Sequence, residues 1–478
     1  MTDLTHLTAA ELAAAVAGGK ASAVEVAQAH LDRIAAVDDR VHAFLQVDTD
    51  GALSAAKAVD AKRAAGEQLS SLAGVPLAMK DVVVTKGLPT TAGSKILKGW
   101  VPPYDATIAR RIKDAGIVML GKTNMDEFAM GSSTENSAYG PTHNPWDLSR
   151  VPGGSGGGSA AAVAAGMVAM AHANDGGGSI RIPASCCGLF GLKPTRGRNP
   201  LGPHYGDIFS GFVVEHAVTR SVRDSAALLD ATAGPDLGDP YAVPAPARPY
   251  SEEVNRPPGF LRVAFTTSAA TGVPVHADCV RAVQEAATLC AELGHDVSEA
   301  TPALEGDTIS QAFLTVWTAG AAWSIDDWAR RTKQAPSPEC FEPLTWGLYE
   351  MGTGRRAADY LLAIQDLQRV TRQIAQFFVQ YDVWLSPTLA EPPPPLGSFD
   401  PTPDNPMQGL LRAMQFVPFT PIFNATGQPA MSVPLLWNQE NVPVGVQFAG
   451  RFGDEATLLR LAAQLEQARP WAGRWPAP

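Results

Sequence analysis

The fold of this chain is decided by two glycine–serine loops, Gly153-Gly-Ser-Gly-Gly-Gly-Ser-Ala-Ala-Ala162 and Asn174-Asp-Gly-Gly-Gly-Ser-Ile-Arg-Ile-Pro-Ala-Ser185. The small residues between them, from Ala160 to about Met170, predict a closely packed helix. Clustered glycines let the backbone adopt positive φ angles and approach a bound group closely. Consecutive N–H groups in such a turn can hold a phosphate or a developing oxyanion.

Three interpretations of these loops compete. Gly156-x-Gly158-x-x-Ala161 matches the dinucleotide pattern G-x-G-x-x-[GA] and makes a dinucleotide-binding oxidoreductase a distant alternative. Against it, the segment 145–152 holds two prolines and no apolar strand, and we expect Asp175 to begin a glycine turn instead of ending a strand. The second interpretation is two flexible turns around a buried helix. The third is a catalytic pair of loops.

Composition restricts the class of protein. The chain has 478 residues and a net charge of −11, and its densest basic run is Arg330-Arg-Thr-Lys333. A nucleic-acid or anionic membrane surface needs a clustered positive field, so we expect neither partner. The longest run of small apolar residues, Ala160 to Ala171, is shorter than the ~20 residues of a membrane helix. The N-terminus has no signal-peptide pattern, and we expect a cytoplasmic protein.

Cysteine spacing gives no sign of a metal site or of a disulfide framework. None of the five cysteines forms a C-x-x-C pair, and we expect reduced, buried thiols. No cofactor and no metal are therefore expected. The cysteines are Cys186, Cys187, Cys279, Cys290 and Cys340.

Apolar patterning predicts an α/β protein. Thr8-Ala-Ala-Glu11 and Ser22-Ala-Val-Glu25 are capping boxes that predict two helix starts. From residue 72 to about 230, short apolar strands alternate with helical stretches and glycine turns, which favours a sheet flanked by helices. The stretch 311–381 is predicted to be mostly helical. Further strands are expected at Val75–Met79, Ile117–Leu120, Leu261–Phe265, His295–Val297, Val383–Leu385, Met431–Pro434 and Val444–Phe448.

Taken together, the two loops resemble the amidase-signature family, whose motif is G-G-S-S-G-G-S followed by D-T-G-G-S-I-R-x-P. The resemblance extends from about residue 5 to 470. It implies one amidase-signature catalytic domain over 1–478, with a central mixed β-sheet covered by helices on both faces. Within it we expect N-terminal helices at about 5–65, a catalytic core at about 70–230 and a variable, pocket-forming helical region at about 300–380. The supporting segments are Gly74–Asp81, Gly121–Ser132, Asn144–Trp146, Gly188–Thr195, Phe423–Ala430 and Pro443–Gln447.

The resemblance also implies roles for individual residues. Ser179 corresponds to the nucleophile, Ser155 to a bridging serine held through a cis peptide after Gly154, and Lys80 to the base. A neutral lysine can accept the serine proton if burial lowers its pKa. Gly156 and Gly176 stand where the family usually has serine and threonine. The remaining implied positions are an oxyanion hole of backbone N–H groups at Gly176, Gly177, Gly178 and Ser179, substrate contacts at Met130, Gly131 and Ser132, and a structural brace of Asp175 with Arg181.

Two branches of the family compete for the substrate. Residues 123–146 resemble the glutaminase-type A subunit of an aspartyl/glutamyl-tRNA amidotransferase. However, the arginine expected to hold the glutamine carboxylate is missing: Leu367 falls near its position, and Arg369 and Arg372 do not align with it. The stretches 172–185, 193–198 and 445–471 resemble instead the 6-aminohexanoate cyclic-dimer hydrolase branch.

We therefore predict a stand-alone amidase for hydrophobic, aryl or oligomeric amides, nylon oligomers among them. It would act through an acyl-enzyme, with side activity on esters and carbamates. Its partner would be a small-molecule amide substrate, without nucleic acid or membrane, and a homodimer is left open. The alternative is the amidotransferase A subunit.

A tryptophan-rich helical segment matches no family motif, and specificity is expected to vary there. Ordinary core packing explains each aromatic residue singly, but we expect two or three of the group to line the pocket. The six residues are Trp317, Trp323, Trp328, Phe341, Trp346 and Tyr349.

Overall fold

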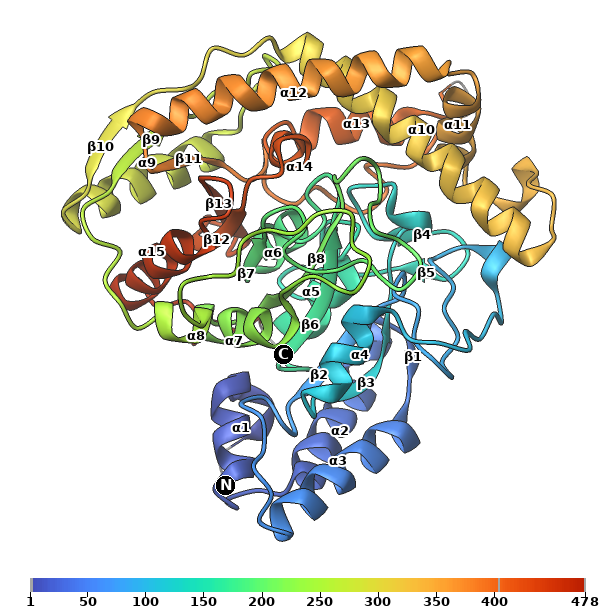
Figure 1. Cartoon of the computed structure of the whole chain (residues 1–478), viewed down its shortest axis with the longest axis vertical. Coiled ribbons are helices and arrows are strands. Elements are labelled where there is room, and N and C mark those ends of the chain that lie inside the picture. The colour runs from blue at the N-terminus through green and yellow to red at the C-terminus, as the bar shows by residue number, and fades with distance from the viewer. Residues whose placement is uncertain (1–2, 403–404, 477–478) are drawn as a thin grey trace.

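The computed structural model describes residues 3–402 and 405–476, and its centre is one mixed β-sheet (Figure 1). Eleven strands of the described chain follow the order β1-β3-β2-β6-β8-β7-β12-β13-β11-β9-β10, and β4 with β5 forms a separate small sheet. The strands are β1 Phe44–Val47, β2 Pro76–Lys80, β3 Val118–Thr123, β4 Glu135–Asn136, β5 Gly140–Pro141, β6 Met170–Asp175, β7 Phe190–Lys193, β8 Val214–Thr219, β9 Arg262–Phe265, β10 Asp296–Glu299, β11 Val383–Pro387, β12 Ala430–Trp437 and β13 Pro443–Gly450.

Helices pack on both faces of this sheet. Alternate residues of a strand point to opposite faces, and β11 shows both being covered: Val383 and Leu385 enter an apolar core with α9 and α15, whereas Trp384 enters another with α12 and α14. The predicted central mixed sheet with helices on both faces is confirmed. The helices are α1 Ala9–Ala17, α2 Ala23–Val41, α3 Thr49–Ala64, α4 Thr107–Asp114, α5 Gly157–Ala164, α6 Arg181–Cys187, α7 Val222–Thr232, α8 Tyr250–Glu253, α9 Ala277–Glu292, α10 Gly306–Thr332, α11 Pro343–Thr353, α12 Ala357–Gln380, α13 Gln408–Phe416, α14 Pro421–Thr426 and α15 Glu455–Ala468.

The N-terminal helices begin where the capping boxes predict. The N–H of Glu11 donates to Thr8 Oγ1 at 3.3 Å, while the N–H of Thr8 donates to the Glu11 carboxylate at 2.8 Å. Ser22 and Glu25 repeat this arrangement at the start of α2. Each box satisfies two backbone donors that a helix start leaves free. In Figure 1, α1, α2 and α3 lie together at the end of the molecule that holds β1, β2 and β3.

The chain between the two glycine–serine loops differs from its prediction. The predicted helix from Ala160 to Met170 ends at Ala164, because Gly166 takes a φ of +74° and turns the chain out of the helix. Met170 instead begins β6, which runs to Asp175. Asp175 thus ends a strand, contrary to expectation. The segment before Gly156 contains no strand, as expected, which argues against a dinucleotide loop.

The predicted helical region at 311–381 is confirmed as α10, α11 and α12, which lie together at the far end of the molecule from α1 (Figure 1). The division of the chain into N-terminal helices, core and variable region stays a prediction. Across residues 3–402 and 405–476, no helix has the length and apolar character needed to cross a membrane.

Candidate active site

Strand β2 carries Lys80 at its carboxyl end, where the side chain is completely buried. Its Nζ donates to Ser155 Oγ at 2.6 Å and to Asn174 Oδ1 at 2.6 Å. Burial lowers the pKa of Lys80 to about 8, although the carboxylates of Asp126, Glu215 and Asp175 act in the opposite direction. Since the ordinary lysine pKa is about 10.4, a useful fraction of this amine is neutral near pH 8.

Ser155 lies in the first loop, just before α5, and is itself buried. The peptide bond between Gly154 and Ser155 is cis, as the family resemblance implies. A Cβ atom on Gly154 would lie 2.5 Å from the backbone nitrogen of Ser133, so only glycine fits this approach. Thr134 Oγ1 accepts from the N–H of Gly157 and donates to the carbonyl of Gly153, which holds both sides of the loop.

The second loop carries Ser179 between β6 and α6, where its side chain is 6% exposed and reaches two cavities. Gly178 takes a φ of +139°, and Thr420 Oγ1 donates to the carbonyl of Gly177 at 2.6 Å. Within the described chain, the backbone N–H groups of Gly177, Gly178 and Ser179 donate to no protein acceptor. Free donors beside a buried hydroxyl can stabilise negative charge that develops on a substrate oxygen.

A buried ion pair supports this second loop from behind. The Nε and Nη2 of Arg181 donate to the two Asp175 oxygens, both at 2.9 Å, and both side chains are fully buried. Burial alone would raise the pKa of Asp175, but the guanidinium of Arg181 outweighs it, and the pKa falls to about 2. Arg181 also donates to the carbonyl of Thr420 and to the side chains of Gln447 and Asn424. The geometry therefore fits the expected brace.

Replacing Arg181 with alanine is expected to lower the free energy of unfolding by about 3–5 kcal/mol, because the Asp175 carboxylate would remain buried without its partner. Urea denaturation of the wild type and the variant measures this loss. Arg369→Ala is the control, since Arg369 pairs with Asp366 on the surface, and its change should stay within about 0.5 kcal/mol. Equal losses in the two variants would contradict the brace.

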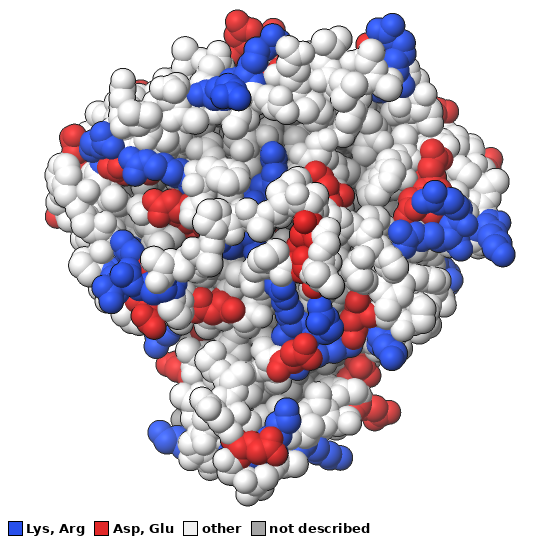
Figure 2. Space-filling model, viewed as in Figure 1, with Lys and Arg blue, Asp and Glu red and all other residues white. Residues whose placement is uncertain are grey.

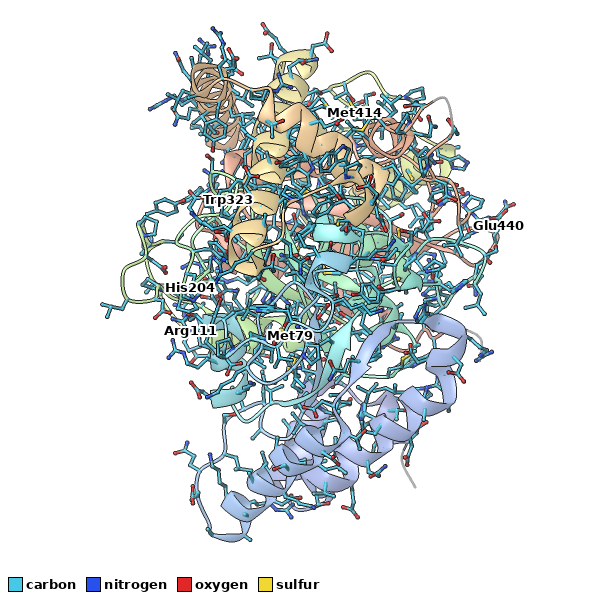
Figure 3. All side chains as sticks on the ribbon, turned by 90° about the vertical axis from the view of Figure 1, so that its right-hand side faces the viewer. Met79, Arg111, His204, Trp323, Met414 and Glu440 are labelled. Carbon is cyan, nitrogen blue, oxygen red and sulfur yellow. The ribbon has the colours of Figure 1, made fainter. Side chains whose placement is uncertain are left out.

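Two cavities meet at Ser179. The smaller one, of about 140 Å³, is lined by Ser155 and Asn174 among others, and the larger one, of about 540 Å³, lies toward α13 and α14. In Figure 3, Trp323 of α10 and His204 mark the smaller cavity, and Met414 of α13 marks the larger one. The larger cavity is lined by the three predicted contact residues Met130, Gly131 and Ser132.

Three of the six aromatic residues of the tryptophan-rich segment line a cavity, where two or three were expected. Trp317, Trp323 and Trp328 line the smaller cavity, and Trp317 also reaches the larger one. The other three aromatic residues line neither cavity and belong to an apolar cluster that includes α11. They are Phe341, Trp346 and Tyr349.

Two polar residues of the site, Asn174 and Glu215, were not assigned roles from the sequence. Asn174 stands in the quoted second loop, yet nothing in its spacing indicates that it accepts from Lys80. Glu215 lies opposite Asn174 in the β6–β8 pairing, and His172 Nε2 lies 2.7 Å from its carboxylate. Only the strand pairing brings these groups together. No cluster of metal-ligating side chains exists in the part of the chain that the structure describes.

Known proteins resemble this chain along nearly its whole length. A family model described as Amidase matches residues 25–459. The A subunit of glutamyl-tRNA(Gln) amidotransferase from Salinispora arenicola (strain CNS-205) is 44% identical over 98% of this chain and 98% of its own. The solved 6-aminohexanoate cyclic dimer hydrolase superposes with a TM-score of 0.93 at 33% identity, covering 100% of this chain and 99% of that one. The corresponding A subunit from Thermotoga maritima superposes with a TM-score of 0.78 at 30% identity, covering 100% and 98%.

These relatives contradict two predictions. Curated relatives that are 38–44% identical over 97–99% of this chain are named as the A subunit of glutamyl-tRNA(Gln) amidotransferase, so the prediction of a stand-alone amidase for hydrophobic, aryl or oligomeric amides is wrong. The prediction of a small-molecule partner without nucleic acid is wrong for the same reason. The first prediction depended on the missing arginine and on the stretches 172–185, 193–198 and 445–471, and the second depended on the lack of a clustered basic run. Leu367 is indeed a buried core residue of α12, but one exchanged position does not outweigh similarity along the whole chain.

Proposed function

Because this chain belongs to the amidase-signature family, and is therefore a hydrolase of carbon–nitrogen bonds in amides, we propose that it is the glutaminase-type A subunit of an aspartyl/glutamyl-tRNA amidotransferase. In that role it would release ammonia from a primary amide for a reaction on tRNA. The observation that carries this proposal is the 44% identity to such a protein over 98% of both chains.

The proposed chemistry begins at Ser179. Neutral Lys80 takes a proton from Ser155 across their 2.6 Å hydrogen bond, and Ser155 takes the proton of Ser179 as its oxygen attacks the amide carbon. The proton then returns through Ser155 to the departing nitrogen, which leaves as ammonia. Water hydrolyses the acyl-enzyme along the same route, and Ser179 is restored. Each of these steps uses only side chains of the chain itself and water.

The second loop stabilises the negative oxygen of the tetrahedral intermediate. The N–H groups of Gly176, Gly177, Gly178 and Ser179 are the proposed donors, and those of the last three have no protein acceptor in the described chain. Donors that are fixed in advance cost no reorganisation when the charge appears. Arg181 keeps them in place through Asp175 and Thr420, so the brace acts on the reaction without contacting substrate.

The larger cavity is the proposed site for the acyl part of the amide. Met130, Gly131 and Ser132 line it together with many apolar side chains and several hydroxyl and amide groups, and its described lining holds one carboxylate, Asp307, but no lysine or arginine. The carboxylate of glutamine would therefore be met by neutral donors. Ser310 and Gln311 of α10 are two of these donors.

Ammonia release tests the proposal. The purified chain is assayed with glutamine alone, and then with the remaining amidotransferase subunits and glutamyl-tRNA(Gln). We expect release to rise at least tenfold in the complete assembly and to be abolished there by Ser179→Ala. Equal release by the chain alone, or no association with the other subunits, would contradict the proposed function. On the face shown in Figure 2, basic and acidic residues are intermixed, so this face offers tRNA no clustered positive surface.

A further inference from the structure

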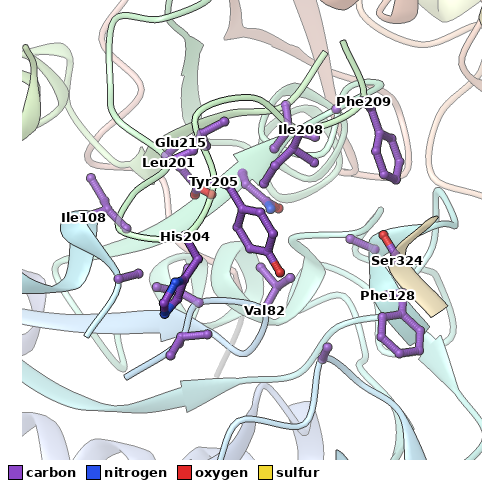
Figure 4. A pocket seen from close by; sticks show the side chains of 18 of the residues that line it. Val82, Ile108, Phe128, Leu201, His204, Tyr205, Ile208, Phe209, Glu215 and Ser324 are labelled. Carbon is purple, nitrogen blue, oxygen red and sulfur yellow. The ribbon is translucent and has the colours of Figure 1, made fainter. Parts of the chain in front are cut away.

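The smaller cavity beside Ser155 is lined largely by aromatic and aliphatic side chains. Aromatic side chains surround it, with Tyr205, Phe209 and Phe128 arranged around the space in Figure 4 and Glu215 on the opposite side from Ser324. One water occupies roughly 10–15 Å³ of such volume, so about 140 Å³ accommodates a group of several heavy atoms. The cavity is larger than an ammonia molecule requires. Its remaining aromatic walls are Tyr104, Trp317, Trp323 and Trp328.

Glu215 is the one carboxylate of this lining, and no lysine or arginine accompanies it within the described residues. Its side chain is nearly buried, and its carboxylate lies 2.7 Å from His172 Nε2. His172 is completely buried, and its Nδ1 has no hydrogen-bond partner in the described chain. The carboxylate of Glu215 is thus held on one side by the His172 ring and lines the cavity on the other.

A negative carboxylate among aromatic faces is the chemistry that recognises an organic cation. Aromatic faces attract an ammonium through their negative quadrupole, most strongly where water is excluded. Lys80 approaches the same region but does not line the cavity, because its Nζ is held by Ser155 and Asn174. Glu215 thus lines the cavity and also acts electrostatically on Lys80.

From this combination we propose that the smaller cavity is a binding site for organic ammonium ions, in which Glu215 opposes the positive charge and Trp317, Trp323 and Tyr205 enclose the attached carbon group. The site lies on the side from which the amine departs, because Ser155 lines it and returns the proton to the leaving nitrogen. This last placement rests on the proposed function. The proposed binding of organic ammonium ions does not depend on that function.

Calorimetric titration of the purified chain with benzylammonium chloride tests the site, and benzyl alcohol is the uncharged probe of the same shape. We expect the wild type to bind the ammonium about tenfold more tightly than the alcohol. Glu215→Gln should reduce that preference to less than about threefold. Asp307→Asn is the matched control, since Asp307 is the carboxylate of the larger cavity, and it should leave the preference unchanged.

Equal affinity of the wild type for the two probes would overturn the proposal. A preference that is lost in Asp307→Asn and kept in Glu215→Gln would also overturn it, by placing the cation in the larger cavity. If Glu215→Gln does not fold, Trp323→Ala decides: Trp323 lies at the rim and is 40% exposed, and its loss should weaken benzylammonium binding at least threefold. Unchanged binding there would refute the site. Because no turnover is involved, a chain that fails to release ammonia with its partner subunits can still pass this test.

Discussion

Ser179→Ala is expected to lower kcat/KM for amide hydrolysis by about 10⁴- to 10⁶-fold, because the attacking oxygen is removed and no neighbouring group replaces it. The oxyanion donors and the cavities remain, so substrate binding should persist. Steady-state ammonia release measures the loss. Unfolding of the variant should match that of the wild type, since the serine is small and its Oγ has no protein hydrogen-bond partner in the described chain.

Ser268→Ala is the matched control for this substitution. Ser268 also lines the larger cavity, but its hydroxyl has no part in the proposed proton transfer. We expect its kcat/KM to stay within about tenfold of the wild type. Residual activity of Ser179→Ala at a similar level would mean that another residue attacks the amide.

Lys80→Ala is expected to remove the general base and lower kcat/KM by about 10²- to 10⁴-fold. In the wild type, kcat/KM should rise as pH increases through the pKa of Lys80, near 8, because the neutral amine is the active form and protonation below that pH removes it. The rate should level off at higher pH. The dependence of kcat/KM on pH between 6 and 10 measures both effects.

Lys80→Arg is the control that separates charge from basicity. A guanidinium retains its proton throughout this pH range, so the variant should be as inactive as Lys80→Ala. A rise in activity near pH 6.5 that survives in Lys80→Ala would assign the base to a histidine. His172, whose Nδ1 has no partner among the described residues, would be the first to test.

The family motif indicates Lys80 and Ser155 as neighbours in the site, and their catalytic roles stay a prediction. Lys80 and Ser155 are 75 residues apart, yet they form a 2.6 Å hydrogen bond. The capping boxes at Thr8 and Ser22 were equally predictable, since a cap depends on a local pattern of four residues.

What the sequence could not show arises from strand pairing. Asn174 and Glu215 become neighbours only because β6 and β8 pair in one register. The end of α5 was misplaced because alanine and glycine occur alike in the helix and in the loop after it, and the left-handed turn at Gly166 has no distinctive sequence signal here. Composition predicted a helix where the backbone makes a turn.

The substrate prediction failed for a different physical reason. It depended on three short stretches and on one missing cationic side chain, and Leu367 at that position is buried in a core against α10. A small ligand is held by few groups, and the loss of one can be offset by others in the same cavity. Similarity over the whole chain includes the core and the surfaces that bind partners, and it is less sensitive to such an exchange.

Covalent labelling is the most direct test of the central claim that Ser179 is the nucleophile activated through Ser155 and Lys80. The wild-type chain is treated with a serine-reactive fluorophosphonate, digested and analysed by mass spectrometry, with Ser179→Ala and Lys80→Ala treated in parallel. The account predicts one adduct, on Ser179, that is absent from Ser179→Ala and forms much more slowly in Lys80→Ala. An adduct on another serine, or undiminished labelling of Ser179→Ala, would contradict it.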